Sequence, residues 1–570
     1  MQKKFLLASA ILAVSLQAAA QTTATNYKGV GNGNPISGSV FCADPTALDY
    51  EGRLYVYGSN DHQQFIKNGK KGDNGYGDIK SLVVFSTDDM VNWTFHGTID
   101  VNKLCSSWGW QFAASWAPSA VWRKHPTSGK DEFFIYFANS AGSVGVLKGY
   151  SPIGPFTSPL SAPMINGNSS GVSPCKWCFD PGAVIDENGV GWISFGGGGH
   201  DQGDSHGTNL QPDNACIAKL KTDMIHLDGR AVKIPAPYHF EANELNIINN
   251  RFVYTYCTHF GTHDQWNTYD KRGSYSAPGG GIMCYMVGDD PLAPQDWDYK
   301  GEYGPHPGTS GNNHSHLHKF QGKYYHIYHS GALLEGMKSK GAISGAGGYR
   351  SICVNAATVN ENTQTISRVS LNNTGVNSIK NLNPYELQQA ETMSCSGGVM
   401  YEDFKNVKAN SSRSALGNDA SLNLYVKMAK NSWISVRKVD FGTEGAKSFI
   451  FRAKGSGKLE IRVNSISASS IKATAEFTSS TNNFEDHVIE VDPEVFKGIK
   501  SNIFFVFSES TNAQFDAWQF YEENLTKVQD VQTQPSGNKK KGIFDLNGRR
   551  LQNSSKKHGI IIENGKKVIR

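Results

Sequence analysis

Five stretches of the chain repeat one pattern of hydrophobic and polar positions. Each stretch opens with a turn rich in Gly, Asn or Asp and continues as a run of alternating aromatic or aliphatic residues. Alternation with a period of two, bounded by turn residues, predicts β-hairpins. The stretches begin roughly 60 to 80 residues apart and read "EGRLYVYGS", "KDEFFIYFANS", "NGVGWISFGGG", "NNRFVYTYCTH" and "QGKYYHIYHS".

An apolar strand opened by polar or aromatic residues stands just upstream of each hairpin. This spacing predicts an all-β fold, a five-bladed β-propeller, in which each blade is a small antiparallel sheet whose first strand lines a central channel. Five residues near the starts of these strands are then expected to converge on one axis, although they are far apart in the sequence: Asp44, Trp116, Asp180, Glu241 and His314.

The pattern changes after the stretch "NLNPYELQQAETMS". Short alternating strands at regular spacing follow, which predicts a β-sandwich. We therefore expect a propeller over residues 34–383 and a sandwich over residues 386–522. Residues 524–541 are polar and typical of a linker, and the tail over residues 542–570 is expected to form two short strands around "NG" turns.

The N-terminus has the pattern of a secretory signal peptide. Lys3 and Lys4 precede the apolar run "FLLASAILAVSL", and "QAAA" follows, so we expect a signal peptide over residues 1–20. No later stretch of the sequence is apolar over enough residues to span a bilayer as a helix. The sequence therefore predicts an exported protein, secreted or held at the cell surface.

Composition and charge argue against nucleic acid as a partner. The chain has 60 glycines, 11% aromatic residues and only 19% charged residues, which is typical of strands and turns. Its formal charge is +4, but residues 524–570 contain eleven Lys or Arg against three acids. The rest of the chain is thus slightly acidic, and a groove that follows phosphates is not expected.

Nine cysteines in an exported chain allow up to four disulfides and leave at least one thiol over. Cys175 and Cys178, in "CKWC", are the one closely spaced pair. No second pair completes a zinc site, so we interpret this pair as structural, either a disulfide or packed thiols, rather than as a redox or metal motif.

Taken singly, an Asp-Pro pair is most often a turn. Here Asp44, Asp180 and Glu241 recur at the same place in three repeats, which favours a shared site. Strand alternation puts Glu241 and Glu244 on opposite sides, so one of the two faces the channel and Glu244 is expected to be solvated or ion-paired. Trp116 is either a core residue or a platform for a sugar ring.

Three histidines, His314, His316 and His318, alternate in "NNHSHLHKF". On a strand they share one face, which is a geometry that could bind zinc. The alternative is that His316 and His318 are packing or surface residues.

Several stretches together resemble glycoside hydrolase family 43, and more narrowly its arabinoxylan arabinofuranohydrolases. The likeness runs from about Asn34 to Asn383, touches all five predicted blades, and is carried by "ADPTALDYEGRLYVYGSND", "ASWAPSAVW", "FFIYFANSAGSVGVLKGYSPIGPF", "FDPGAVIDENGVGWISFGGG", "HFEANELNIINNRFVYTYC", "GNNHSHLHKFQGKYYHIYH" and "GGYRSICVN".

The resemblance implies an inverting mechanism with Asp44 as general base and Glu241 as general acid. Asp180 matches the carboxylate that raises the pKa of the acid and orients it. His314 matches a histidine that helps to hold calcium through water, and Arg350 matches an arginine that contacts substrate. Trp116, in "SWAP", is expected at the channel mouth as a substrate-binding platform.

The resemblance implies an exo-acting α-L-arabinofuranosidase that trims arabinoxylan or a related hemicellulose, without an organic cofactor, and we expect a monomer. A β-1,4-xylosidase of the same family is the near alternative, and a non-catalytic surface glycan-binding protein is the alternative from another class. A fructan-cleaving propeller enzyme would carry its acid in an "EC" context, whereas this acid lies in "FEAN".

The C-terminal regions carry two further resemblances. Residues 386–522 resemble a family 6 carbohydrate-binding module, with Gln389 where a glutamate usually stands near the structural calcium and Gln514 near the usual ligand-binding asparagine. Trp433 and Trp518 are either core residues or sugar platforms. The tail "GIFDLNGRRLQNSSKKHGIIIENGKKVIR" resembles the C-terminal sorting tails of the type IX secretion system.

Overall fold

The structure is a computed structural model. It describes residues 23–198, 210–309, 312–406, 424–480 and 483–525, together with the backbone of four short strands in the tail. The predicted signal peptide lies outside the described residues, as does almost all of the predicted linker.

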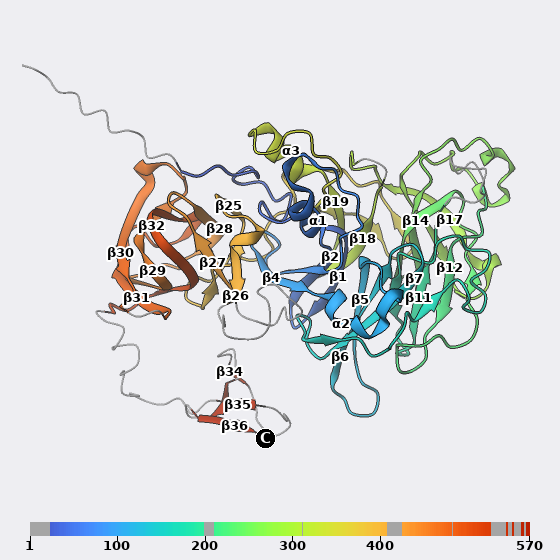
Figure 1. Cartoon of the computed structure of the whole chain (residues 1–570), viewed down its shortest axis with the longest axis horizontal. Helices are drawn as coiled ribbons and strands as arrows, with labels where there is room; N and C mark the ends of the chain where they lie inside the picture. Colours follow the sequence, from blue (N-terminus) through green and yellow to red (C-terminus); the bar gives the residue numbers. More distant parts are fainter. Residues whose placement is uncertain are drawn as a thin grey trace, which may run out of the picture.

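Five antiparallel sheets form the five-bladed propeller that the sequence predicts (Figure 1). Their innermost strands, β1, β5, β10, β14 and β18, contact one another in a ring. In chain order the blades contain β1 (Ala43–Tyr50), β2 (Arg53–Ser59), β3 (Leu82–Thr87) and β4 (Trp93–Ile99); β5 (Trp116–Lys124), β6 (Asp131–Asn139), β7 (Ser143–Gly149), β8 (Phe156–Thr157) and β9 (Ile165–Asn166); β10 (Gly182–Ile185), β11 (Gly191–Phe195), β12 (Cys216–Lys219) and β13 (Val232–Lys233); β14 (His239–Ile248), β15 (Arg251–Thr258), β16 (Met283–Gly288) and β17 (Asp298–Gly304); and β18 (Ser315–Phe320), β19 (Lys323–Ser330) and β20 (Ser351–Ala357).

Helices are short and lie in the connections between strands. The α-helices of the described residues are α1 (Asp61–Asn68), α2 (Val101–Leu104) and α3 (Ala332–Ser339), and none is long and apolar enough to cross a membrane. The 3₁₀ turns are η1 (Gly69–Lys71), η2 (Ser106–Gln111), η3 (Trp266–Thr268), η4 (Asp270–Arg272), η5 (Pro294–Asp296), η6 (Tyr401–Asp403) and η7 (Ala468–Ser470).

The N-terminal segment closes the ring. The backbone amide of Ile36 donates to the carbonyl of Ile352, and that of Cys42 donates to the carbonyl of Arg350, at 2.8 and 3.0 Å. The segment therefore runs beside β20 of the last blade and leads directly into β1 of the first. This pairing joins the two ends of the propeller without a free strand edge between them.

The second region is a curled sheet system that wraps around an aromatic core. Its two longest strands, β29 and β32, pair with each other over most of their length. A short pair, β21 (Val359–Asn360) and β22 (Thr365–Ile366), precedes the region, whose strands are β23 (Gln388–Gln389), β24 (Thr392–Met393), β25 (Cys395–Gly397), β26 (Phe404–Asn406), β27 (Leu424–Met428), β28 (Trp433–Asp440), β29 (Ser448–Val463), β30 (Ile471–Thr478), β31 (Glu485–Glu490) and β32 (Ile499–Tyr521).

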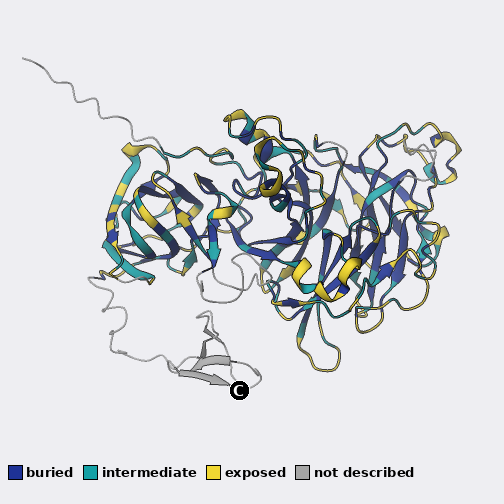
Figure 2. Ribbon diagram, viewed as in Figure 1, coloured by how far each residue is buried: buried dark blue, intermediate teal, exposed yellow. Residues whose placement is uncertain are grey.

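One of these strands belongs to the propeller instead. β24 pairs with β4, so the first blade has the order β1-β2-β3-β4-β24. One hydrophobic cluster likewise includes Val56 and Phe95 of the propeller with Phe404 and Phe449 of the sandwich. Figure 2 shows the dark blue of buried residues along most propeller strands and into this junction. The two regions therefore share a core.

The tail contains more strands than the two that the sequence predicts. Its backbone forms a small sheet in the order β34-β33-β35-β36, in which β33 is followed by β34 and β35 by β36 as two antiparallel pairs. The strands are β33 (Ile543–Phe544), β34 (Arg550–Leu551), β35 (Ile560–Glu563) and β36 (Lys566–Ile569).

Candidate active site

A kink recurs at the start of the innermost strands. A non-glycine residue adopts positive φ at Asp44 (48°), Ala117 (37°), Asp180 (45°) and Ala242 (61°). The strand pairing shifts register at three of these positions, in β1, β5 and β14. Such bulges re-aim side chains and store strain, and both features are common at functional sites. The kink is the structural basis of the repeated position that the sequence reveals.

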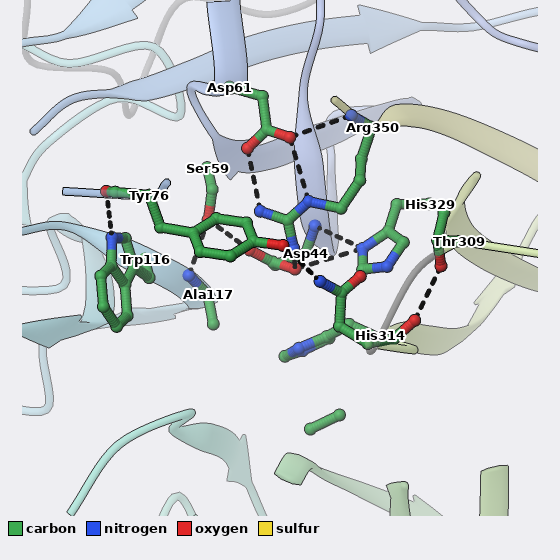
Figure 3. A network of polar contacts seen from close by, with 12 residues as sticks. Asp44, Ser59, Asp61, Tyr76, Trp116, Ala117, Thr309, His314, His329 and Arg350 are labelled. Carbon is green, nitrogen blue, oxygen red and sulfur yellow. Dashed lines mark hydrogen bonds and ion pairs between the residues drawn. The ribbon is translucent and has the colours of Figure 1, made fainter. Parts of the chain in front are cut away.

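Asp44 lies at the centre of a polar network and is 6% exposed. Its carboxylate accepts hydrogen bonds from Ser59 Oγ at 2.7 Å and Arg350 Nη1 at 2.6 Å, and His329 Nδ1 lies 3.1 Å from it (Figure 3). Burial by itself raises the pKa of the Asp44 carboxyl, but the Arg350 guanidinium and His329 outweigh burial and hold that pKa well below its usual range. Asp44 is therefore ionised.

Arg350 is held by two carboxylates. Its Nε and Nη2 donate to Asp61 at 3.0 and 2.9 Å, and its Nη1 donates to Asp44. The ring of Tyr76 lies over the guanidinium, with 5.1 Å between Cζ and the ring centroid. Arg350 is only 5% exposed. The structure thus directs this arginine toward Asp44, and its predicted contact with substrate stays a prediction.

Asp61 is a site residue that the sequence analysis missed. It is fully buried at the start of α1 and accepts further hydrogen bonds from the amide of Arg350 at 3.0 Å and from Asn74 Nδ2 at 2.9 Å. These contacts fix the guanidinium, so Asp61 is a positioning residue. A lone Asp after a strand gives no local signal, and the contact spans 289 residues of sequence.

Asp180 and Glu241 form the second half of the site. Asp180 Oδ2 accepts a hydrogen bond from the amide of Ala242 at 2.9 Å, next to Glu241 in β14. Burial, followed by the charge of Asp44, raises the pKa of Asp180 to about 7. Burial, followed by the charges of Asp180 and Asp44, raises the pKa of Glu241 well above its usual value. Glu241 is therefore suited to carry a proton at neutral pH.

Glu244 departs from the simple alternation that the sequence suggests. The bulge between Glu241 and Glu244 breaks the period of two, because Ala242 adopts positive φ. Glu244 is fully buried rather than solvated, and one carboxylate oxygen lies 3.0 Å from His316 Nδ1. The solvated alternative is therefore wrong, and the ion-paired one stays a prediction that this contact supports.

The three alternating histidines each lie next to a different carboxylate. His314 Nδ1 lies 3.7 Å from Asp180, His316 faces Glu244, and His318 Nε2 lies 3.4 Å from Asp49. Among the described residues no group of three or more His, Cys, Asp or Glu is placed to hold a metal ion, so the zinc interpretation is wrong. Burial lowers the pKa of His314 to about 4, which makes this imidazole neutral.

Trp116 stands beside the polar network and is half-buried. Its indole Nε1 donates to the carbonyl of Tyr76 at 3.1 Å, and the two rings meet edge to face with centroids 6.5 Å apart. Tyr76 OH also accepts a hydrogen bond from Asn312 Nδ2 at 3.0 Å. Tyr76, which the sequence analysis missed, thus connects the predicted platform to Arg350.

Buried side-chain oxygens in the sandwich region form a candidate metal site. Gln389 Oε1 and both carboxylate oxygens of Glu391 are buried and meet no hydrogen-bonding partner in the described parts of the chain. Burial raises the pKa of Glu391 well above its usual value, and the charge of Asp516 adds to this. A carboxylate and an amide oxygen are ligands that calcium prefers, so these residues fit the ion.

The two tryptophans of the sandwich are core residues. Trp433 and Trp518 are each 1% exposed. They pack against Phe504 and Phe505 respectively. Gln514 lines a polar groove of about 440 Å³ with Lys454, Gly455, Ser456, Thr478, Ser479, Thr511 and Asn512.

Comparisons with known proteins agree with this geometry. A model of the glycosyl hydrolases of family 43 matches residues 32–341. An arabinoxylan arabinofuranohydrolase of Bacillus subtilis is 35% identical over 523 residues, covering 88% of this chain and 94% of the relative, and one of Paenibacillus polymyxa is 33% identical over 519 residues, covering 88% and 76%.

A solved structure is similar over the same extent. It is a family 43 arabinoxylan arabinofuranohydrolase from Bacillus subtilis in complex with cellotetraose, with a TM-score of 0.76 and 32% identity, and the match covers 88% of this chain and all of that one. A match of this length includes the sandwich as well as the propeller. On the family model and these relatives together, the chain belongs to glycoside hydrolase family 43.

Proposed function

We propose that this chain is an exo-acting, inverting glycoside hydrolase that removes α-L-arabinofuranosyl side chains from arabinoxylan. The observation that carries the proposal is the opposite protonation of two carboxyl groups in one buried site. Asp44 is held ionised by Arg350, whereas the pKa of Glu241 is raised by burial and by its acidic neighbours. The names of the two relatives, both arabinoxylan arabinofuranohydrolases, support the substrate.

In this mechanism Asp44 is the general base and Glu241 the general acid. Asp44 takes a proton from a water molecule that attacks the anomeric carbon, while Glu241 protonates the departing glycosidic oxygen on the opposite face. Asp180 keeps Glu241 protonated by like-charge repulsion and orients β14 through the amide of Ala242. Ser59 and Arg350 already hold the Asp44 carboxylate, so these fixed partners stabilise its charge without reorganisation during the reaction.

Trp116 and Tyr76 are proposed to contact the sugar. Both are half-buried next to Asp44 and Arg350, and an indole face suits the apolar face of a sugar ring. The substrate role of Arg350 is proposed as indirect: its Nη1 donates to the base Asp44, Asp61 holds its other two donors, and Tyr76 covers its face.

Product analysis tests the reaction. Incubation of the purified full chain with arabinoxylan is expected to release arabinose, and proton NMR of the first-formed sugar is expected to show inverted anomeric configuration. Release of xylose from xylo-oligosaccharides without arabinose would support the β-1,4-xylosidase alternative. A retained anomer would contradict the mechanism, and glycan binding without any product would support a non-catalytic protein.

Calcium is proposed as the metal of this chain. Gln389 and Glu391 would hold it in the sandwich, where it would supply a counter-charge for the buried carboxylate and tie the start of the sandwich to β32. A water-mediated role for His314 in the channel is proposed separately. Chelation is expected to lower the Tm, calcium but not zinc is expected to restore it, and Glu391→Gln is expected to remove this response. A chelation response that survives Glu391→Gln would assign the ion to the channel.

The remaining proposals concern location and partners. A signal peptide and a type IX-like sorting tail would place the enzyme outside the cell or on its surface as a monomer, where plant cell-wall polysaccharide is its partner. The sandwich is proposed to be a family 6-like carbohydrate-binding module that uses the groove around Gln514. Proteomics of the medium and of the cell surface, with and without residues 542–570, tests the location.

A further inference from the structure

Three cysteines and a lysine form a cluster in the third blade, apart from the carboxylates of the candidate active site. Cys175 and Cys178 lie in the segment that leads to Asp180, and Cys216 begins β12. All nine cysteines of the chain lie in described residues, and all are free thiols. No metal site is formed by these thiols, because no group of three ligating side chains is found among the described residues.

Cys175 and Cys216 are direct neighbours. The two residues meet at one carbonyl: the amide of Cys175 donates to the oxygen of Val172 at 2.9 Å, and Cys216 Sγ lies 4.0 Å from the same oxygen. Cys175 Sγ lies 2.8 Å from the carbonyl oxygen of Trp177 and 3.1 Å from that of Asn214, two residues before Cys216. Lys233 Nζ lies 3.2 Å from Cys216 Sγ. A cationic amine beside a pair of thiols favours the thiolate, which is the nucleophile in disulfide chemistry.

Gly196 allows the close approach of the Cys175 segment to the sheet. A Cβ at this position would meet Cys175 Sγ at 3.0 Å and the carbonyl oxygen of Asn214 at 2.1 Å. Its φ of 118° also lies in the region that favours glycine. A side chain at residue 196 would therefore displace the sulfur of Cys175 from its position against the third blade.

Cys175 is the reactive member of the cluster. It is half-buried, whereas Cys178 and Cys216 are buried. The neighbouring Cys216 lowers the pKa of the Cys175 thiol to about 7, whereas Cys175 and burial raise the pKa of Cys216 well above its usual value, so the thiolate resides on Cys175. Burial raises the pKa of Cys178, so that thiol stays protonated at neutral pH.

We propose that Cys175 and Cys216 form an intramolecular disulfide when the chain meets a small-molecule disulfide oxidant, such as oxidised glutathione. The Cys175 thiolate attacks one sulfur of the oxidant and expels the first thiolate, which leaves a mixed disulfide. Cys216 gives its proton to solvent and attacks Cys175 Sγ, which expels the second thiolate. Two protein thiols are oxidised and one oxidant disulfide is reduced to two thiols, so atoms and electrons balance.

The bond would cross-link the approach to Asp180 with the third strand of its own blade. The segment already pairs with the sheet edge through Trp177, whose amide donates to the carbonyl of Gly197 at 3.0 Å, and through Phe179, which accepts from Gly196 at 2.8 Å. A covalent tie from residue 175 to residue 216 restricts the unfolded chain and therefore stabilises the folded one. An oxidising exterior is a setting in which such a bond persists.

Peptide mapping tests the proposal on the full chain. The reduced protein is incubated under native conditions with oxidised glutathione, remaining thiols are alkylated, and the digest is analysed by mass spectrometry without reduction. The expected result is a cross-linked pair of peptides containing Cys175 and Cys216, two fewer titratable thiols, and a Tm higher by roughly 3–8 °C. A bond between Cys175 and Cys178, a mixed disulfide that does not resolve, or nine free thiols would each overturn it.

Matched variants separate the cross-link from general effects of the oxidant. Cys178→Ser keeps the proposed pair, so its Tm is expected to rise on oxidation as in the parent. Cys175→Ser and Cys216→Ser are each expected to lose that rise, and Cys175→Ser retains a half-exposed position that tolerates a hydroxyl. If Cys216→Ser does not fold, Cys216→Ala gives the same test. An oxidant-dependent rise that persists in Cys175→Ser would overturn the assignment.

Discussion

The propeller and the sandwich each bury an arginine, but with different numbers of carboxylates around it. In the sandwich, Arg462 is 1% exposed and pairs with Glu460 at 2.6 Å, one charge against one. At the propeller axis, Arg350 lies among four carboxyl groups: Asp44, Asp61, Asp180 and Glu241.

The difference teaches what an excess of buried carboxylates does. A balanced pair neutralises itself and serves the fold. Four carboxyl groups around one cation do not all ionise readily at neutral pH, because like charges repel and burial disfavours each charge. The excess is resolved by protonation, which leaves Asp44 ionised and raises the pKa of Asp180 and Glu241. An acid and a base then coexist at one pH, as general acid–base catalysis requires.

The largest expected effect comes from removal of the acid or the base. Asp44→Asn and Glu241→Gln are each expected to lower turnover by about 10³-fold or more, because each removes a proton-transfer partner from the transition state. Activated aryl glycosides need little protonation, so they are expected to rescue Glu241→Gln and not Asp44→Asn. Steady-state kinetics on both substrate types measures this. Glu244→Gln, at a buried carboxylate outside the pair, is the control, and near-normal turnover of either first variant would contradict the assignment.

The next prediction compares variants at the carboxylate partners of the two buried arginines. Asp61→Asn is expected to lower turnover by roughly 10–100-fold, because Arg350 loses the partner that fixes its orientation toward Asp44. Glu460→Gln removes the one carboxylate of Arg462 and is expected to cost about 3–5 kcal/mol of unfolding free energy while the folded enzyme keeps its turnover. Activity and denaturant unfolding are measured on both variants. If Asp61→Asn loses only stability, then Asp61 is structural, like Glu460.

A third prediction tests whether the two regions are separable. Phe404 of the sandwich meets Phe95 of the first blade edge to face, with ring centroids 4.8 Å apart. Phe404→Ala is expected to cost about 3–5 kcal/mol and to lower the Tm of both regions together, because it opens a cavity in a shared core. Calorimetry is expected to show a single thermal unfolding transition for this variant. Two transitions, with only the sandwich displaced, would show independent domains.

The shared core also sets an expectation for truncation. A chain that ends near Asn383 loses β24 from the first blade and exposes Phe95, so we expect a lower Tm for the truncated propeller than for the full chain. The proposed catalytic groups all lie before that point, so any fraction that folds is expected to hydrolyse small arabinosides. A folded truncated protein without this activity would place a required group in the sandwich.

A smaller effect concerns pH. If Glu241 is the general acid, as proposed, it must be protonated, so activity is expected to be retained up to its raised pKa and to be lost as pH rises through it. Asp180→Asn removes a neighbouring negative charge, which lowers the pKa of Glu241 and moves the basic limb of the kcat/KM profile to lower pH. An unmoved limb would show that Asp180 acts only by orienting β14.

The smallest effect is expected in the groove of the sandwich. Gln514→Ala is expected to weaken activity on insoluble arabinoxylan by roughly 2–5-fold, because a sandwich that binds the polymer, as proposed, raises the local concentration of substrate without adding catalytic contacts. Activity on a soluble nitrophenyl arabinoside is the control and is expected to stay unchanged. If Gln514→Ala matches the parent chain on both substrates, the sandwich is a structural appendage.

Much of the architecture follows from the sequence because its signals are local. Alternation with a period of two and turn residues at regular spacing predict the hairpins, and five repeats predict five blades. Asp44 and Asp180 recur at one position because each sits at the same kink before a proline, a conformation encoded within a few residues. The signal for Glu241 is weaker, since Ala242 takes the kinked place there, and the family resemblance supplied its role.

The partners of these residues were decided only by closure of the ring. Asp61 and Arg350 are 289 residues apart, and no local pattern marks Asp61. Glu244 was misjudged because alternation assumes a regular strand, whereas a single bulge changes the face of every later residue. β24 pairs with the first blade rather than with the sandwich, because the exposed edge of β4 gains hydrogen bonds from a strand that packs against it. Local sequence determines the strands and kinks, but burial, charge and protonation depend on which distant side chains the closed fold brings within a few ångströms.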